Sequence, residues 1–393
     1  MDKRRILLSV FMASFASTLL QRGIYFFMHD VLGFSQAQNL WVALLVGITY
    51  IFGATSSHKL TVRFGERKIL LTVLVVLATA HAALACFPRN SALLVPLFAL
   101  IVTVQGTMWP IFESYMSAGE TPKTLGRALG RYNISWALSV PVSLAVAGPL
   151  IASGQPASLF AAAAALNALV ALSCVTYPAQ PSHLDAGHAE RPDAQKLGRY
   201  RSLLAAARFA MLGSYALMYV IAPLMPEIMK SIGFNVAAAA RASSLLDVAR
   251  LAAFIALFTY SGWHGRATPV LLAICALPAG FALVLFGSSV ATVVPGELLF
   301  GAAAGFLYTA ALYYAQVVEN ASVDAGGAHE ALIGLGYAVG PAAGLIGSAI
   351  ASGAGPGSAA YVHGMSIATL PVVLGSTLAA LWPLLKSRKS MSS

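Results

Sequence analysis

Twelve long apolar runs, separated by short polar stretches, constrain the fold of this sequence more than any other feature. A helix needs about 20 apolar residues to cross the hydrocarbon core of a bilayer. Only 10% of the residues are charged and 58% are hydrophobic, whereas a soluble domain carries about 25% charged residues. We therefore predict an all-α polytopic membrane protein with twelve transmembrane helices. The predicted spans lie at approximately 6–30, 37–57, 68–88, 92–116, 126–152, 157–177, 202–225, 236–261, 267–288, 291–316, 329–352 and 360–385.

The distribution of basic residues predicts the orientation of these spans. Lys and Arg outnumber Asp and Glu by 24 to 14, and most of them fall in alternate loops and near the two ends of the chain. This positive-inside pattern places both termini in the cytoplasm, and we expect the protein to lie in the cell (inner) membrane. The first apolar run continues past Tyr25, which is too long for a cleaved signal peptide.

Several kinds of partner are not expected from the sequence. No basic stripe with interleaved aromatic residues suggests nucleic-acid binding. The three cysteines, Cys86, Cys174 and Cys275, lie far apart inside apolar runs, so neither a disulfide framework nor a metal site is predicted. We expect a monomer without metal or cofactor whose partners are the lipid bilayer and a small-molecule substrate.

The two halves of the chain share landmarks at a nearly constant spacing. Leu-Gly-Phe at 32–34 matches Ile-Gly-Phe at 232–234, and Ala-Ser-Gly recurs at 152–154 and 351–353. Such spacing predicts two pseudo-symmetric six-helix bundles related by an axis along the membrane normal. In transporters of this kind the substrate site lies between the halves near the midplane.

These landmarks divide the chain into an N-terminal bundle at 1–177, a cytoplasmic central linker at 178–200 and a C-terminal bundle at 201–393. The linker is polar and contains His183, Asp185 and His188. A segment of this composition is expected to be a linker and not a metal site, because it lacks the packing that would orient ligands.

Together with this organisation, the segment 58–68 resembles the major facilitator superfamily. That family carries the cytoplasmic motif Gly-x-x-x-Asp-Arg-x-Gly-x-Arg-Arg/Lys between its second and third helices. The matching residues are Arg63, Gly65, Arg67 and Lys68, whereas Val62 stands where the motif has its Asp. The resemblance covers essentially the whole chain and implies a secondary transporter that works by alternating access.

Two further motifs bear on the kind of transporter. The fourth span contains Gln105-Gly106, which is similar to the Arg-x-x-Gln-Gly motif of drug/proton antiporters, but Val102 replaces its Arg. The glycines of Gly336-x-x-x-Gly340-Pro341 in the eleventh span are similar to an antiporter pattern and also fit close helix packing. The missing Arg counts against efflux of amphipathic drugs or lipids, which remains the alternative function.

Charged side chains inside apolar spans are the main candidates for function. Such charges cost roughly 2.5–3.5 kcal/mol each on insertion scales, so they mark a site hypothesis. Asp247 and Arg250 lie three residues apart near the middle of the eighth span, and we expect them to form an ion pair. This pair bears a weak resemblance to the helix-8 Asp/Arg pair of monocarboxylate transporters. Arg22 lies deep in the first span.

Residues three and four apart share a helix face, and this rule extends the site along the polar faces of the spans. The predicted substrate-binding residues are Arg22, Tyr25, Gln105, Trp109, Tyr215, Tyr219, Arg250 and Tyr308. Asp247 and Glu113 are candidates for proton coupling, and Glu113 is also a candidate partner of Arg127 or Arg131. A cytoplasmic gate is predicted from Arg63, Arg67, Arg127, Arg131 and Glu330.

The predicted function is transport of a small organic solute, with an anionic carboxylate favoured because guanidinium groups bind carboxylates in bidentate fashion. Asp247 could couple the transport to protons if a substrate anion competed for its arginine partner. An enzyme is not expected, because no His-Glu-x-x-His, Gly-x-Ser-x-Gly or nucleotide-binding glycine motif occurs. A channel is less consistent with a six-plus-six repeat.

Overall fold

The computed structural model describes residues 2–392 except 121, 156, 183–193 and 319–322. Every regular element in this part of the chain is an α-helix. The first half contains α1 (Lys3–Gln21), α2 (Gly23–Asp30), α3 (Gln36–Phe64), α4 (Glu66–Cys86), α5 (Ser91–Ser117), α6 (Pro122–Ala152) and α7 (Ala157–Cys174). The second half contains α8 (Ala194–Ser231), α9 (Val236–Ala242), α10 (Leu245–Thr259), α11 (Ala267–Leu285), α12 (Val290–Val318), α13 (Val323–Ile350) and α14 (Ala359–Ser392).

These helices form twelve candidate membrane spans, as the sequence predicts. The first span consists of α1 and α2, which are interrupted at Arg22, and the eighth consists of α9 and α10, which are interrupted at Ser243 and Ser244. Large apolar side chains such as Trp41, Phe52 and Leu172 point outward and are exposed. Apolar exposure of this extent fits contact with lipid.

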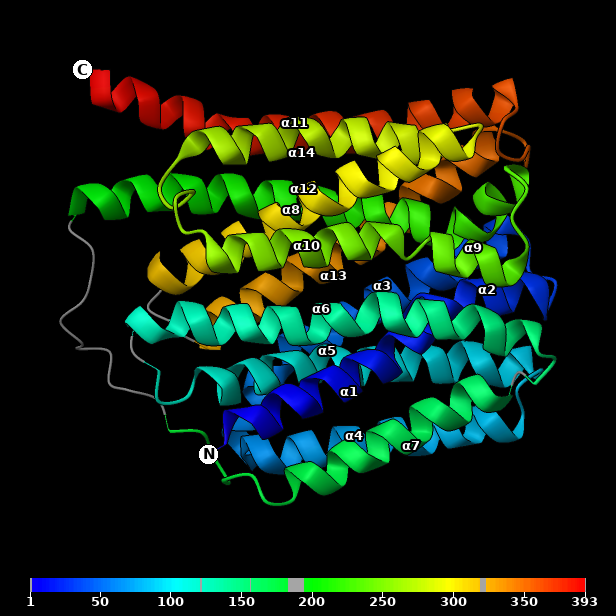
Figure 1. Ribbon diagram of the computed structural model, residues 1–393, viewed down its shortest axis with the longest axis horizontal. Coiled ribbons are helices and arrows are strands. Elements are labelled where there is room, and N and C mark those ends of the chain that lie inside the picture. Colours follow the sequence, from blue (N-terminus) through cyan, green and yellow to red (C-terminus); the bar gives the residue numbers. More distant parts are fainter. Residues whose placement is uncertain (1, 121, 156, 183–193, 319–322, 393) are drawn as a thin grey trace.

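The two halves lie side by side as bundles with their helices roughly aligned (Figure 1). Both chain termini are at one end of the molecule, which we call the terminal end; the opposite end, which contains residues 31–35, is the far end. The seventh span begins earlier than predicted, because α8 starts at Ala194, inside the predicted linker. His183, Asp185 and His188 lie outside the described residues.

Short turns fix the direction of neighbouring spans. Gly65 alone separates α3 from α4 and has a φ of +84°, a conformation that suits glycine because it has no Cβ. This is the glycine of the motif at 58–68. Arg67 of that motif donates a hydrogen bond to the backbone carbonyl of Tyr177 at 2.9 Å, which ties the turn to the end of the first bundle.

The bundles meet along two seams. At one, α3 packs along α13, and at the other, α6 packs against α9 and α10. Close approach at the first seam depends on Gly47, because a Cβ at this position would collide with the backbone carbonyl of Tyr337. Small residues at helix interfaces permit such backbone contacts in membranes. The space between the seams contains the candidate site.

Candidate functional site

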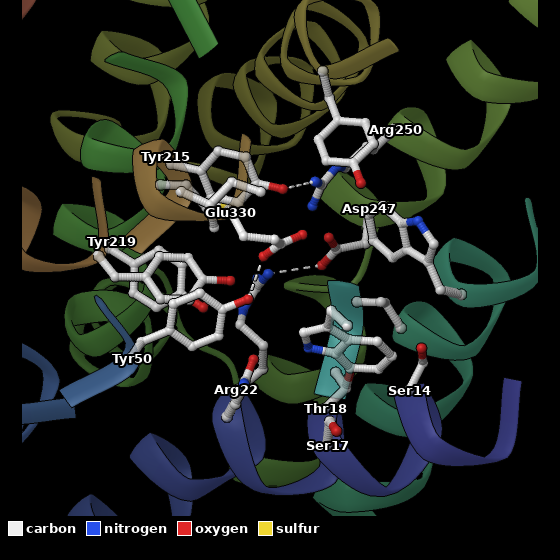
Figure 2. Close-up of a pocket in the computed structure, with 18 of the residues that line it drawn as sticks. Ser14, Ser17, Thr18, Arg22, Tyr50, Tyr215, Tyr219, Asp247, Arg250 and Glu330 are labelled. Atoms are coloured by element: carbon white, nitrogen blue, oxygen red, sulfur yellow. Dashed lines mark hydrogen bonds and ion pairs between the residues drawn. The ribbon is translucent and has the colours of Figure 1, made fainter. Parts of the chain in front are cut away.

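A small cavity of about 100 Å³ lies between the bundles at the middle of the molecule (Figure 2). Both halves of the chain contribute to its wall, through α1, α3, α5 and α6 on one side and α8, α10, α12 and α13 on the other. Its polar and aromatic lining residues are Ser14, Ser17, Thr18, Gln21, Arg22, Tyr50, Trp109, Tyr132, Trp136, Tyr215, Tyr219, Asp247, Arg250, Tyr308, Glu330 and Tyr337.

An ion pair between the two bundles crosses this cavity. The guanidinium of Arg22 donates a hydrogen bond to Asp247 Oδ2 at 2.9 Å, and the two side chains are only 11% and 2% exposed. Asp247 is in the first turn of α10, and Arg22 follows the last residue of α1. A helix N-terminus stabilises an anion, so the start of α10 favours the charge of Asp247, whereas Arg22 lies between the end of α1 and the start of α2, whose effects on a cation oppose one another.

This geometry corrects the prediction that Asp247 pairs with Arg250. Among the described residues no ion pair joins these two side chains, although they are one turn apart on α10. The reason is that the ion-pair partner of Asp247 comes from the other bundle, where the break after α1 brings the guanidinium of Arg22 to the carboxylate of Asp247. The other carboxylate oxygen of Asp247, Oδ1, is buried and has no hydrogen-bond partner among the residues that the structure describes.

Arg250 lies among aromatic rings. The centre of its guanidinium is 4.7 Å from the ring centroid of Trp136, 5.3 Å from Tyr215, 5.4 Å from Tyr308 and 5.7 Å from Phe254. It also donates a hydrogen bond to the hydroxyl of Tyr215. Cation–π contacts of this kind contribute about 0.5–2 kcal/mol each, the upper value applying where water is excluded. The cation is therefore stabilised without being neutralised.

Glu330 is also in the cavity wall. Its carboxylate accepts a hydrogen bond from the hydroxyl of Tyr50, so this contact too joins α13 of the second bundle to α3 of the first. The sequence placed Glu330 in a gate, because position 330 stood at the start of the predicted eleventh span. The helix in fact begins at Val323, which places Glu330 two turns inside it and at the cavity.

Comparison with known proteins decides the family. The sequence profile of the Major Facilitator Superfamily matches residues 6–344. The chain belongs to the major facilitator superfamily. It is therefore a secondary transporter of small molecules and not an enzyme. No curated protein matches the chain, and no narrower family is identified, so the likeness to monocarboxylate transporters remains a resemblance.

Solved structures of this superfamily share the fold of the transporter. A POT family transporter in complex with 5-aminolevulinic acid superposes with a TM-score of 0.74 at 11% identity, covering 98% of this chain and 96% of that one. A bacterial homologue of the human lysosomal transporter Spinster gives 0.69 at 16% identity, covering 98% and 97%. The human organic anion transporter MFSD10 (TETRAN) gives 0.67 at 15% identity, covering 98% and 99%. At these identities the likeness concerns the fold alone.

The structure brings most of the predicted substrate-binding residues of the transporter to one place. Six of them line the cavity, namely Arg22, Trp109, Tyr215, Tyr219, Arg250 and Tyr308. Two do not. Gln105 is wholly buried and accepts a hydrogen bond from Gln21 at 2.6 Å, so it supports a lining residue. The hydroxyl of Tyr25 is buried without a hydrogen-bond partner in the described part of the chain.

The remaining predicted gate residues are spread over the terminal end. Glu113 is 6% exposed, and no described ion pair joins it to Arg127 or Arg131, which are exposed. Arg63 is stacked on the ring of the adjacent Phe64. The predicted pairing of Glu113 is therefore absent from this conformation.

Sequence reasoning missed one wall of the cavity. Tyr132, Trp136 and Val140 of α6 all line it, and they recur at a spacing of four residues. That spacing, with two aromatic residues, was a signal that could have identified the face. Glu297 of α12 was visible as a charge inside an apolar run, but its place near the outer end of the predicted span favoured the membrane interface. It is in fact wholly buried, and neither carboxylate oxygen has a hydrogen-bond partner among the described residues.

Proposed function

We propose that this transporter moves a small organic solute bearing a carboxylate across the cell membrane by alternating access, with the central cavity as its substrate site. The observation that carries the proposal is the presence of two guanidinium groups, Arg22 and Arg250, in one cavity between the bundles. Arginine stays charged and presents a planar fork that matches a carboxylate. Serine, threonine and tyrosine hydroxyls in the same wall supply further hydrogen bonds.

The Arg22–Asp247 ion pair supports proton coupling. A substrate carboxylate that bound Arg22 would compete with Asp247, whose carboxylate would then lie buried without a counter-charge. A buried, unpaired carboxylate favours its protonated form. Substrate and proton would thus each promote binding of the other, which is the condition for coupled transport.

The experiment is uptake into proteoliposomes under an imposed pH gradient, comparing the native protein with Asp247→Asn. We expect the variant to lose pH-driven accumulation while it still exchanges substrate down a concentration gradient. Asp2→Asn is a matched control, because Asp2 is exposed at the terminal end and lies outside the cavity lining. Full accumulation by Asp247→Asn that still follows the pH gradient would refute the coupling role.

The orientation of the protein follows from the basic residues. We propose that the terminal end is cytoplasmic, since the terminal segments and the motif at 58–68 are rich in Lys and Arg, as the positive-inside pattern requires. A monomer is the proposed functional unit, because the cavity is formed within one chain.

Efflux of amphipathic drugs or lipids is the second candidate. The aromatic residues around Arg250 favour it, whereas two buried arginines disfavour binding of lipophilic cations. Stabilisation of the purified protein against heat by lipophilic cations, but not by organic anions, would favour efflux over the first proposal.

A further inference from the structure

Two charges in the cavity wall have no counter-charge at hydrogen-bond distance in the described part of the chain. Arg250 has aromatic rings and the hydroxyl of Tyr215 as its neighbours. Glu330 has the hydroxyl of Tyr50. By contrast, Arg22 and Asp247 balance one another at 2.9 Å. The cavity wall therefore contains one guanidinium and one carboxyl group that have no ion-pair partner at salt-bridge distance among the described residues.

Such groups are costly unless something neutralises them. A charge taken out of water loses several kcal/mol of hydration, and a neutral hydroxyl restores only a part of it. Arg250 is 5% exposed and Glu330 is 4% exposed, so water reaches neither of them freely. Both side chains nevertheless line the same cavity (Figure 2), where a bound molecule could contact them.

The two charges belong to the same bundle. Arg250 is on α10 and Glu330 is on α13, and both helices pack within the second half of the chain, with α12 against α10 and α8 against α13. When the bundles rock against each other as rigid bodies, the spacing between these two charges is retained. A molecule with two opposite charges could remain bound to one bundle throughout the transport cycle.

Neighbouring groups favour a cation at Glu330. Glu113 of α5 is buried and close enough to Glu330 for the two carboxyl groups to interact electrostatically. One oxygen of Glu113 also has no hydrogen-bond partner in the described residues. Two buried acids near one wall of a cavity disfavour one another's charged form, and an ammonium group bound beside them would stabilise that form. The wall around Arg250 contains two guanidinium groups, Arg22 and Arg250, and one carboxylate, Asp247, so these three residues together carry a net positive charge.

We propose that the substrate is a zwitterion, with its carboxylate on Arg250 and Arg22, where it competes with Asp247, and its ammonium on Glu330. The inference rests on the proposed function and narrows the solute from a carboxylate to an amino-carboxylate. The hydroxyls of Tyr215 and Tyr50 already contact the two charges and are placed to donate or accept hydrogen bonds at the two ends of such a molecule.

The test uses compounds from which one charge is removed at a time. The purified full-length protein is heated with each of the twenty standard amino acids, with their N-acetyl derivatives, which keep only the carboxylate, and with their amides, which keep only the ammonium. We expect at least one amino acid to stabilise the protein in a saturable manner. Its N-acetyl and amide forms should bind at least about tenfold more weakly, because each loses a charged hydrogen bond.

The variant Glu330→Gln identifies the group responsible. In this variant, the affinities for the amino acid and for its N-acetyl form should differ by no more than about threefold. Binding of the N-acetyl form shows that the variant is folded. Glu120→Gln removes a glutamate that pairs with Lys3 outside the cavity, and it should leave the preference for the amino acid over its N-acetyl form unchanged. Arg250→Gln should weaken the binding of the amino acid and of its N-acetyl form to the same extent.

Each contrary result has a distinct meaning. If N-acetyl forms bind the native protein as tightly as amino acids, the zwitterion proposal fails and carboxylate transport stands. If Glu330→Gln keeps the full preference, the assignment of Glu330 fails. If no amino acid stabilises the protein, the inference is overturned, and if only lipophilic cations do, the proposed function fails with it.

Discussion

At the scale of single residues, the Arg22–Asp247 contact is a buried ion pair between the two halves of the transporter. The cost of burying two charges is large, and removing one partner leaves the other charge uncompensated. The pair is therefore expected to matter most when only one of its members is changed.

We predict that Arg22→Gln and Asp247→Asn each lower the stability of the folded protein by about 3–5 kcal/mol, whereas the double variant recovers most of that loss. The physical reason is that the double variant contains no unpaired buried charge. Thermal unfolding of the four proteins in the same detergent measures the coupling. Additive losses in the double variant would show that the two side chains are energetically independent.

Single residues also show how far the sequence could predict the site. Arg22, Asp247 and Arg250 were identifiable because a charge inside an apolar run is conspicuous and costly. Their partners were not, because helical periodicity defines a face of one helix and says nothing about which helix lies opposite. Arg250 illustrates this point, since three of the four rings around it come from α6, α8 and α12.

At the scale of elements, the breaks in the first and eighth spans position the ion pair. The sequence predicted both spans as continuous, because neither break contains a proline and apolar residues continue on both sides. The interruption at Ser243 and Ser244 makes Asp247 a first-turn residue of α10. Discontinuous spans at the midplane are typical of substrate sites in transporters, and composition alone does not reveal them.

Two glycines at helix interfaces differ in what an added side chain would disturb. Gly47 of α3 faces the backbone of Tyr337 in the other bundle, whereas Gly301 of α12 faces the backbone of Leu246 within its own bundle. Added bulk at Gly301 must strain a packed core, which typically costs about 1–3 kcal/mol. Added bulk at Gly47 can be relieved by separation of the two bundles.

We therefore predict that Gly301→Ala lowers the thermal stability, whereas Gly47→Ala shifts the conformational equilibrium towards states in which α3 and α13 are apart. The readout for the shift is the rate at which a cysteine at position 29 reacts with a water-soluble thiol reagent, which should rise in Gly47→Ala. Gly375→Ala is the control, because a Cβ there meets nothing within 4 Å. Equal stability losses and unchanged labelling in the two variants would contradict this distinction.

At the scale of the whole molecule, the far end is closed by contacts between the bundles. His29 Nε2 of α2 is 3.9 Å from a carboxylate oxygen of Glu227 on α8. The side-chain amide of Asn39 donates hydrogen bonds to the carbonyl of Tyr25 in its own bundle and to that of Pro223 across the interface. The terminal end instead contains a hollow of about 430 Å³ between α6, α10 and α12.

The central cavity, at about 100 Å³, is smaller than the roughly 300–1,000 Å³ of most ligand sites. The two ends must therefore open in turn for a substrate to enter and leave. We predict that a short, reducible cross-linker between cysteines at positions 29 and 227 stops transport and that reductant restores it. The native cysteines Cys86, Cys174 and Cys275 are replaced first.

The two single-cysteine proteins serve as controls and should keep their activity after treatment with the cross-linker. Undiminished transport by a fully cross-linked protein would show that the far end does not need to open.

The two-bundle architecture that underlies this prediction was visible in the landmarks repeated about 200 residues apart. The closure of one end was not visible in the sequence, because it depends on contacts between distant segments.

The position of the tryptophans gives the protein an optical property of its own. Trp136 lies against Arg250 and Trp109 lines the same cavity, while Trp41 and Trp382 are on the outer surface and Trp263 is at the terminal end. Indole fluorescence responds to a nearby charge and to the loss of surrounding water. Neutralisation of Arg250 by a ligand therefore alters the emission of Trp136, and occupancy of the cavity can be followed in real time without attaching a dye.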